Sequence, residues 1–204
     1  MTAWDQEAEA ALVARCKDGD DRAWAEVYRT QAPTVAAFLR RLNGPHADVD
    51  ELLQQVFVEL FASIRRFRGD ARLSTWLYRI AANVSAKAER AGGRHRRRLF
   101  AWASALATAP LSEPDPSARV AARSELERVE AALGKLKHIH RTVWVLSEIE
   151  GLSLDEMAEA VGAKVGTVRS RLTKARRLVS AELQRREAAT AGRPALFLRG
   201  QGER

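Results

Sequence analysis

Residues 153–178, SLDEMAEAVGAKVGTVRSRLTKARRL, have the pattern of a helix-turn-helix. Ser153 and Glu156 are spaced as in a capping box, in which each side chain accepts a hydrogen bond from the other residue's backbone N–H at a helix start. Gly162 ends the apolar-periodic stretch and supplies the left-handed residue that a sharp turn between helices requires. Because Ala158 is small, the two helices can cross closely. We therefore expect two short helices joined at Gly162.

The second of these helices has an apolar inner face and a basic outer face. Val168 and Leu172 would pack against the first helix, and polar residues three or four apart would share the opposite face. Such a helix fits the DNA major groove, where Arg and Lys read guanine and hydroxyl groups reach bases or phosphates. We predict DNA binding by Lys164, Thr167, Ser170, Arg171 and Lys174. A helical hairpin with a solvated basic face is the alternative.

The composition favours a chain with apolar cores and a polyanionic partner. Of its 204 residues 46% are hydrophobic, enough for one large domain or two small ones, and the net charge is +8. The single cysteine, Cys16, excludes an internal disulfide and fits a reducing compartment. No apolar run has membrane-spanning length, and the first residues are acidic, unlike a signal peptide, so we expect a cytoplasmic protein.

Charge is unevenly divided along the first hundred residues. Residues 1–62 carry 11 acidic and 6 basic side chains, a net of −5, whereas residues 63–100 carry 11 basic and 2 acidic ones, a net of +9. Adjacent blocks of opposite sign indicate two different partner surfaces on one domain. An ordinary solvated face is an equally good interpretation of the charges alone.

The apolar spacing predicts an all-α protein, since no stretch alternates long enough to indicate a strand. We expect helices over 5–16, over 20–43 with a kink or break at Pro33, over 47–67, and from 73 into the arginines at 94–98. An Ala-, Pro- and Ser-rich segment predicts a flexible linker. The sequence therefore predicts two small helical domains, at 1–98 and at 123–186, joined by the linker at 99–122; the second contains the helix-turn-helix. A tail follows at 187–204, which is either disordered or docks a regulator.

Two of these helices have faces of unusual composition. We expect the third helix to turn Leu53, Val56, Phe57, Leu60, Phe61 and Ile64 inward. The fourth carries an aromatic and basic stripe at helical spacing, formed by Trp76, Arg79, Asn83, Lys87 and Arg90. Rings stack on unpaired bases, at about 1–3 kcal/mol per base, and cations bind the backbone, so the stripe indicates nucleic acid. A single ring such as Tyr78 is more typical of packing.

Catalytic and metal sites are not predicted. His138 and His140 would point about 200° apart on a helix, so they cannot chelate one metal. His46 and His95 lack neighbouring ligands, and Cys16 is typical of a packed thiol. We expect no catalytic residue, no metal, no cofactor and no small-molecule substrate.

Three blocks together resemble the sigma factors of bacterial RNA polymerase, of the extracytoplasmic-function (ECF) type. They are DELLQQVFVELF at 50–61, FRGDARLSTWLYRIAANVSAKAERAGGRHRRR at 67–98, and RTVWVLSEIEGLSLDEMAEAVGAKVGTVRSRLTKARRL at 141–178. They stand in the family's order and cover most of residues 10–185. The resemblance implies a region 2-like domain and a region 4-like domain that bind core polymerase, direct it to promoters and promote melting.

The resemblance also implies roles for individual residues. Region 2 would dock on the β′ clamp helices through Asp50, Glu51, Gln54 and Gln55, although the family usually has an acidic residue where Gln55 stands. The −10 element would be bound, and a flipped base trapped, by Arg68, Ser74, Trp76, Arg79, Asn83, Lys87 and Arg90. Region 4 would read the −35 element, with Arg171 and Lys174 reaching bases and Arg177 reaching phosphate. Region 4 would also bind the β flap of the polymerase. Members of the family are commonly inhibited by an anti-sigma factor, so such a partner is implied here.

Two other functions remain open at this point. One is a repressor or activator that joins a helix-turn-helix to an unrelated sensor domain, which would not need the block at 50–61 or the aromatic–basic helix. The other is a helical adaptor that binds protein only, which would not need the basic stripe from Lys164 to Lys174.

Overall fold

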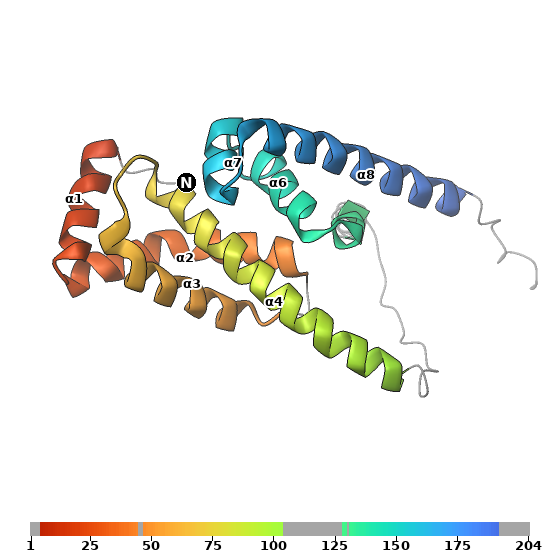
Figure 1. The fold of residues 1–204 in the computed structure, drawn as a ribbon, viewed down its shortest axis with the longest axis horizontal. Coiled ribbons are helices and arrows are strands. Elements are labelled where there is room, and N and C mark those ends of the chain that lie inside the picture. Colours follow the sequence, from red (N-terminus) through yellow and green to blue (C-terminus); the bar gives the residue numbers. More distant parts are fainter. Residues whose placement is uncertain (1–4, 45–46, 104–127, 130, 192–204) are drawn as a thin grey trace, which may run out of the picture.

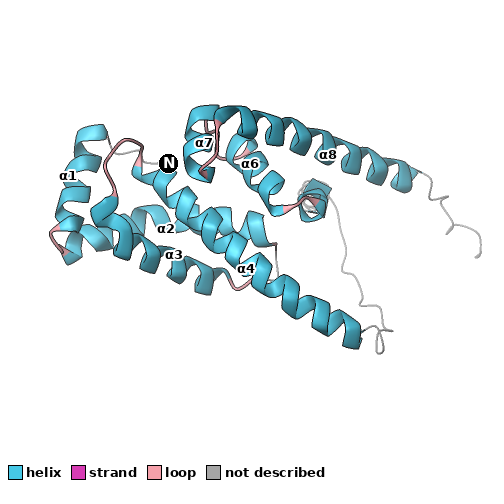
Figure 2. Ribbon diagram, viewed as in Figure 1, coloured by secondary structure: helices cyan, strands magenta, loops and turns pink. Residues whose placement is uncertain are grey.

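The computed structural model describes residues 5–44, 47–103, 128–129 and 131–191, and within these ranges every regular element is helical (Figure 2). The elements are α1 (Gln6–Lys17), α2 (Asp21–Asn43), α3 (Val49–Ser63), the short 3₁₀ helix η1 (Ile64–Arg66), α4 (Leu73–Ala103), α6 (His138–Glu148), α7 (Leu154–Val161) and α8 (Val165–Ala191). A further short helical stretch, residues 131–135, precedes α6. The predicted all-α class is confirmed.

Aspartate side chains begin the first three helices. Asp5, Asp20 and Asp48 each accept a hydrogen bond from a backbone N–H of the first turn, which would otherwise lack a partner. The break that Pro33 was expected to introduce does not occur, since α2 runs through it to Asn43. Ala32 and Val35, on either side of the proline, are both buried in the same core, and this packing offsets the roughly 3 kcal/mol that an interior proline costs.

Helix α3 differs from the expected inward face in one respect. Leu53, Val56, Leu60 and Ile64 are buried, as predicted, but Phe61 is 65% exposed and Phe57 is only partly buried. The prediction that Phe61 faces inward is therefore wrong. The buried residues follow one another at three- and four-residue steps and fill the core stripe, so residues one position further along are rotated about 100° toward its edge.

Helix α4 is anchored at both its start and its buried face. The Glu9 carboxylate accepts a hydrogen bond from the Leu73 N–H at 2.7 Å, and Leu77 and Val84 lie in the core. The helix continues to Ala103, so residues 99–103, which we assigned to the linker, are helical. The rest of the predicted linker, residues 104–122, lies outside the described residues. Similarly, α8 continues through residues 187–191 of the predicted tail, and residues 192–204 lie outside the description.

The helix-turn-helix forms as the sequence predicts. The Ser153 and Glu156 side chains make both hydrogen bonds of a capping box at the start of α7. Gly162 ends α7 with φ +61°, in the left-handed region. Ala158, Val168 and Leu172 are all buried where the two helices cross.

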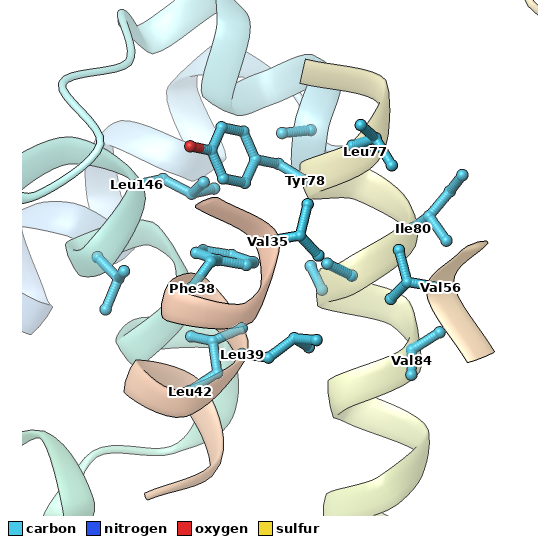
Figure 3. Close-up of a cluster of buried hydrophobic side chains, with 14 of the residues drawn as sticks. Val35, Phe38, Leu39, Leu42, Val56, Leu77, Tyr78, Ile80, Val84 and Leu146 are labelled. Carbon is cyan, nitrogen blue, oxygen red and sulfur yellow. The ribbon is translucent and has the colours of Figure 1, made fainter. Parts of the chain in front are cut away.

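The N-terminal and C-terminal helices pack against each other, which the sequence did not predict. Helix α7 contacts α4, and α6 contacts α2 (Figure 1). Figure 3 shows the shared core, with the Tyr78 ring of α4 over Phe38 of α2 and beside Leu146 of α6. The Phe38 and Tyr78 ring centroids are 4.9 Å apart, and both side chains are almost fully buried. Apolar burial thus joins the two halves.

Replacement of Gly162 by alanine tests the turn. We expect Gly162→Ala to lower the free energy of unfolding by about 1–2 kcal/mol, because an L-residue is strained at this positive φ. Gly166→Ala is the matched control, since Gly166 lies inside α8 with open space around it and alanine should stabilise a helix by about 1 kcal/mol. Urea denaturation followed by circular dichroism measures both; equal effects of the two substitutions would contradict the assignment.

Candidate nucleic-acid and polymerase interfaces

The outer face of α8 is a cationic surface open to solvent. Lys164, Thr167, Ser170, Lys174 and Arg177 are exposed, and Arg171 is half-buried. Ser170, Lys174 and Arg177 line one shallow depression, together with Gly166, Arg169 and Thr173. The structure therefore gathers three of the predicted residues and places Arg169 and Thr173 beside them. Lys164 and Thr167 lie at the N-terminal end of the same face.

Ion pairing separates the arginines of α8 into two groups. Arg176 donates to the Glu148 carboxylate of α6 at 2.7 Å and also bonds Ser147. Its guanidinium is thereby directed to the α6 side of the helix. Arg169 and Arg177 instead line the outer depression. The outer face is thus the side of α8 on which cations are available to a polyanion.

His140 of α6 lies close to this cationic surface. Its side chain is buried, and its Nδ1 atom has no hydrogen-bond partner. Burial lowers the pKa of His140, and the nearby charges of Lys174, Lys137 and Arg171 lower it further. Lys137, Arg171 and Lys174 therefore bring several positive charges together where α6 meets α8.

The aromatic–basic stripe of α4 lies in a groove against α3. Trp76, Arg79, Asn83 and Lys87 line this groove, together with Glu59, Ala62, Ser63, Arg66 and Ile80. Arg79, Asn83 and Lys87 are exposed, whereas Trp76 is partly buried. The structure thus brings four of the seven predicted −10 residues together and adds Arg66. Arg68 lies on a different cleft, beside α1 and α7, and Arg90 and half-buried Ser74 line neither site.

Trp76 combines packing with an unused hydrogen-bond donor. Its ring lies 5.6 Å from the Phe67 ring, and the Arg79 guanidinium is 5.6 Å from the Trp76 ring centroid, a cation–π distance. Its Nε1 atom is buried without an acceptor. In the same groove, Lys87 forms an ion pair with Glu59 at 2.7 Å. Because both side chains are exposed to solvent, this ion pair is weak, and another anion can replace the Glu59 carboxylate.

A third surface, on α2 and α3, is strongly apolar. Tyr28, Val58 and Phe61 are 50%, 61% and 65% exposed, the largest values among the bulky apolar side chains of the described residues. They line a groove together with Trp24, Ala25, Leu53, Phe57, and the polar Asp21, Arg29, Asp50 and Gln54. The rings are paired across it, with Trp24 5.0 Å from Phe61 and Tyr28 4.7 Å from Phe57.

Only two of the four predicted polymerase-contacting residues lie on this apolar groove. Asp50 and Gln54 line it, whereas Glu51 and Gln55 are exposed, bonded to each other at 3.2 Å, and outside it. Sequence analysis missed the aromatic part of the surface because it assigned the apolar residues of α3 to the core. The available signal was an excess of apolar positions over what one core stripe can hold.

Two features are absent from the part of the chain that the structure describes. None of their helices is both long enough and apolar enough to cross a membrane. None of their His, Cys, Asp and Glu side chains form a group of three suited to a metal ion.

Comparisons with known proteins identify both halves of the chain. The family model described as Sigma-70 region 2 matches residues 27–95, and that described as Sigma-70, region 4 matches residues 126–179. The RNA polymerase sigma factor CnrH of Cupriavidus metallidurans is 33% identical over 184 residues, which cover 87% of this chain and 95% of CnrH. The ECF RNA polymerase sigma-E factor of Haemophilus influenzae is 32% identical over 185 residues, which cover 88% of this chain and 97% of that protein.

Solved structures agree with these relatives. The structure of CnrH in complex with the cytosolic domain of CnrY has a TM-score of 0.64 at 29% identity and covers 87% of this chain and 97% of that one. The sigma factor RpoE, in complex with the anti-sigma factor NepR from Bartonella quintana, has a TM-score of 0.57 at 22% identity, covers 78% of this chain and 96% of that one, and shows the fold. From the family matches and the relatives, this chain belongs to the ECF-type sigma factors, the transcription initiation factors that direct RNA polymerase to promoters.

Proposed function

We propose that the two cationic surfaces of this sigma factor read the two promoter elements, α8 the −35 element and α4 the −10 element. The observation that carries this assignment is that the two surfaces lie on different helices and present different kinds of side chain. The α8 surface has basic and hydroxyl side chains suited to the edges of paired bases. The α4 groove adds an aromatic ring and an amide, which suit unpaired bases.

At the −35 element, α8 would enter the major groove with its outer face toward the bases. Ser170, Lys174 and Arg177 stand together on that face, with Arg169 and Thr173 at its edges. Half-buried Arg171 is held nearer the axis of the helix-turn-helix, so it would reach a base with little loss of side-chain freedom. Lys164 and Thr167, at the start of the helix, would contact phosphate or the first base pairs.

At the −10 element, the groove between α3 and α4 would hold unpaired DNA. Arg79 and Asn83 are the exposed groups nearest Trp76 along the helix, and Lys87 continues the stripe by one turn. Lys87 can exchange the Glu59 carboxylate for a DNA phosphate without burial of either charge, because both are solvent-exposed in the pair. Ser74, Arg68 and Arg90 would contact the flanking strand rather than the groove.

The apolar groove of α2 and α3 would be the main contact with core polymerase. Exposed aromatic and aliphatic side chains of this size are typical of protein-binding surfaces. Asp50 and Gln54 at its rim would add polar contacts to the β′ clamp helices, and Glu51 and Gln55 would lie further out. The C-terminal domain would bind the β flap, as the family implies.

Two further features follow from membership of the family. The chain would act by binding rather than by catalysis, in the cytoplasm where bacterial polymerase transcribes. An anti-sigma factor is a proposed partner, since CnrH and RpoE, which share this fold, were each solved in complex with a bound protein, named for RpoE as an anti-sigma factor.

Run-off transcription tests the proposal as a whole. Core polymerase without sigma, the full chain and a genomic promoter library should give discrete start sites that depend on this protein and share two spaced upstream motifs. Two tethered contacts raise the apparent affinity by orders of magnitude, so promoters with only one motif should be much weaker. Binding to duplex DNA without any start site would favour a repressor or activator instead.

Lys174→Ala tests the −35 surface. In the holoenzyme we expect affinity for a −35 duplex to fall by about 1–3 kcal/mol if Lys174 contacts a base. If it contacts a phosphate, the log–log salt dependence should instead become shallower by about 0.9. Arg176→Ala is the control, because Arg176 is already paired with Glu148 on the other side of α8. Fluorescence anisotropy at several salt concentrations gives both values; a normal affinity and slope for Lys174→Ala would exclude the contact.

Phe61→Ala tests the polymerase surface. The side chain is 65% exposed, so we expect little change in stability but at least a tenfold weaker affinity for core polymerase, as for an aromatic residue at the centre of an interface. Arg65→Ala is the control, since Arg65 is exposed in the adjoining η1 and lies outside the groove. Equilibrium binding to labelled core polymerase measures both variants, and unchanged affinity of Phe61→Ala would place the docking surface elsewhere.

A further inference from the structure

One carboxylate stands among the cations of the groove between α3 and α4. The charged residues that line this groove are Arg66, Arg79, Lys87 and Glu59. The three basic side chains suit a polyanion, whereas Glu59 would be repelled by the phosphates of a DNA strand that lies beside it. Phosphate binding by the groove therefore does not explain why Glu59 is part of its lining.

Glu59 is directed into the groove by a contact that joins its two walls. The residue belongs to α3, and its Oε1 atom accepts a hydrogen bond from the Lys87 ammonium of α4 at 2.7 Å. Ser63, one turn further along α3, lines the same groove and donates its hydroxyl proton to the Glu59 backbone carbonyl at 2.7 Å. The Glu59 carboxylate thus points toward α4 rather than to the outer side of α3.

The partner of Glu59 is the same ammonium that we propose binds a DNA phosphate. Lys87 is the only group that bonds this carboxylate among the residues that the structure describes. An ion pair between exposed side chains contributes little to stability, so a phosphate can take the place of the carboxylate. Once Lys87 binds a phosphate, Glu59 faces the strand without a hydrogen-bond donor of its own.

The groove offers many hydrogen-bond donors but few acceptors. Arg66, Arg79 and Lys87 can only donate, and the side-chain amide of Asn83 supplies one acceptor oxygen. An ionised carboxylate is an acceptor only, and both of its oxygens can take part. Hydrogen bonds to a charged group are also stronger than those between neutral groups. Glu59 is therefore the strongest acceptor in the lining.

The apolar part of the groove suits a planar base. Ile80 is buried, Trp76 is partly buried, and Ala62 adds a small side chain to the same lining. The groove has a volume of about 370 Å³, which lies within the range of small-ligand sites. A base that stacks on these apolar groups would have its polar edge within reach of the surrounding donors and of Glu59.

We propose that Glu59 is a specificity-determining residue of this groove, and that it selects an unpaired base with an exocyclic amino group, cytosine or adenine, over thymine. The inference rests on the proposed function, since it requires the groove to hold unpaired DNA. Cytosine N4 and adenine N6 are donors to a carboxylate, and the neighbouring ring nitrogen of either base can accept from Arg79 or Asn83. Thymine has its O4 oxygen in place of the amino group, so two acceptors would face each other and remain unpaired.

The carboxylate should have opposite effects on affinity and on selectivity. Its negative charge opposes the phosphates and competes for Lys87, so it weakens the binding of every strand. Its hydrogen bond favours only the strands with an amino-bearing base. Removal of the charge should therefore strengthen the binding of thymine strands and reduce the preference for cytosine, whereas a loss of folding would weaken all binding.

Binding of single-stranded oligonucleotides to the holoenzyme tests this inference. The probes are a short fluorescein-labelled oligo(dT) strand and the same strand with one central dC or dA, and core polymerase alone gives the background. With the unsubstituted chain we expect the dC and dA strands to bind at least about fivefold more tightly than oligo(dT), as for one base contact of ordinary strength. Fluorescence anisotropy at a fixed salt concentration measures the dissociation constants.

Glu59→Gln is the test variant. Glutamine keeps the shape of the side chain, but its amide both donates and accepts, so it can bond thymine O4 as well as an amino group. We expect the preference to fall to about twofold or less and the affinity for oligo(dT) to rise. Glu26→Gln is the matched control, because Glu26 lies outside both grooves and pairs with Arg15 at 3.8 Å. The Glu26 side chain is 42% exposed, against 41% for Glu59.

Asn83→Ala separates the two proposals, since it should weaken the binding of all strands if the groove holds them. Weaker binding by Asn83→Ala together with an unchanged dC preference in Glu59→Gln would overturn the role of Glu59 and leave the proposed function in place. Equal binding of all three strands by the unsubstituted chain would also overturn that role. If neither variant alters binding, the strand lies elsewhere and both proposals fall. Circular dichroism would verify that each variant retains its helices.

Discussion

Successive residues of an α-helix point about 100° apart, and α4 uses this rotation to face three environments at once. Leu73, Leu77 and Val84 face the core of the N-terminal helices, and Tyr78 and Ser85 face the C-terminal half. Arg79, Asn83 and Lys87 remain exposed. The other elements are arranged around these three faces: α2 and α3 cover the first, α6 and α7 approach the second, and the third is left open.

One helix thus carries both a face that packs against the C-terminal half and the face that we propose binds unpaired DNA. A separation of the two halves would leave the proposed nucleic-acid stripe of α4 unchanged but would expose the Tyr78 face beside it. Binding at one face can therefore bias the other only if it alters the free-energy difference between the compact and open arrangements. The groups that meet between the two halves include the buried Glu150 carboxylate, the buried Arg141 guanidinium and the half-buried His138 imidazole, beside the apolar core.

The proposed polymerase-facing and DNA-facing surfaces are also chemically distinct. The α2–α3 groove is aromatic with an acidic rim, whereas the α3–α4 groove and the outer face of α8 are mainly basic. The acidic and basic blocks in the first hundred residues correspond to this division. Electrostatic attraction alone would draw polyanions to the second type of surface and away from the first. The aromatic groove then supplies contact area that does not depend on charge.

Local sequence was sufficient for much of this protein. The capping box at Ser153, the left-handed turn at Gly162 and the stripes on α4 and α8 all follow from spacing along one helix, because their determinants lie within a few residues. The family resemblance rested on the same local blocks. The domain boundaries and the individual contact residues remain predictions.

Tertiary structure decided which apolar residues are buried and which groups from distant segments meet. Phe57 and Phe61 are four residues apart, like the buried Val56 and Leu60, so periodicity gives two adjoining apolar stripes on α3. The packing of the whole helix against its neighbours determines which stripe is buried and leaves the Phe61 ring on the surface against Trp24. Tyr78 and Glu150 are 72 residues apart, and their hydrogen bond exists because α4 and the C-terminal half pack together. Helical periodicity identifies the apolar and polar faces of one helix but not which other helix packs on each face. That depends on the relative placement of whole helices, which is set by the sum of many long-range contacts.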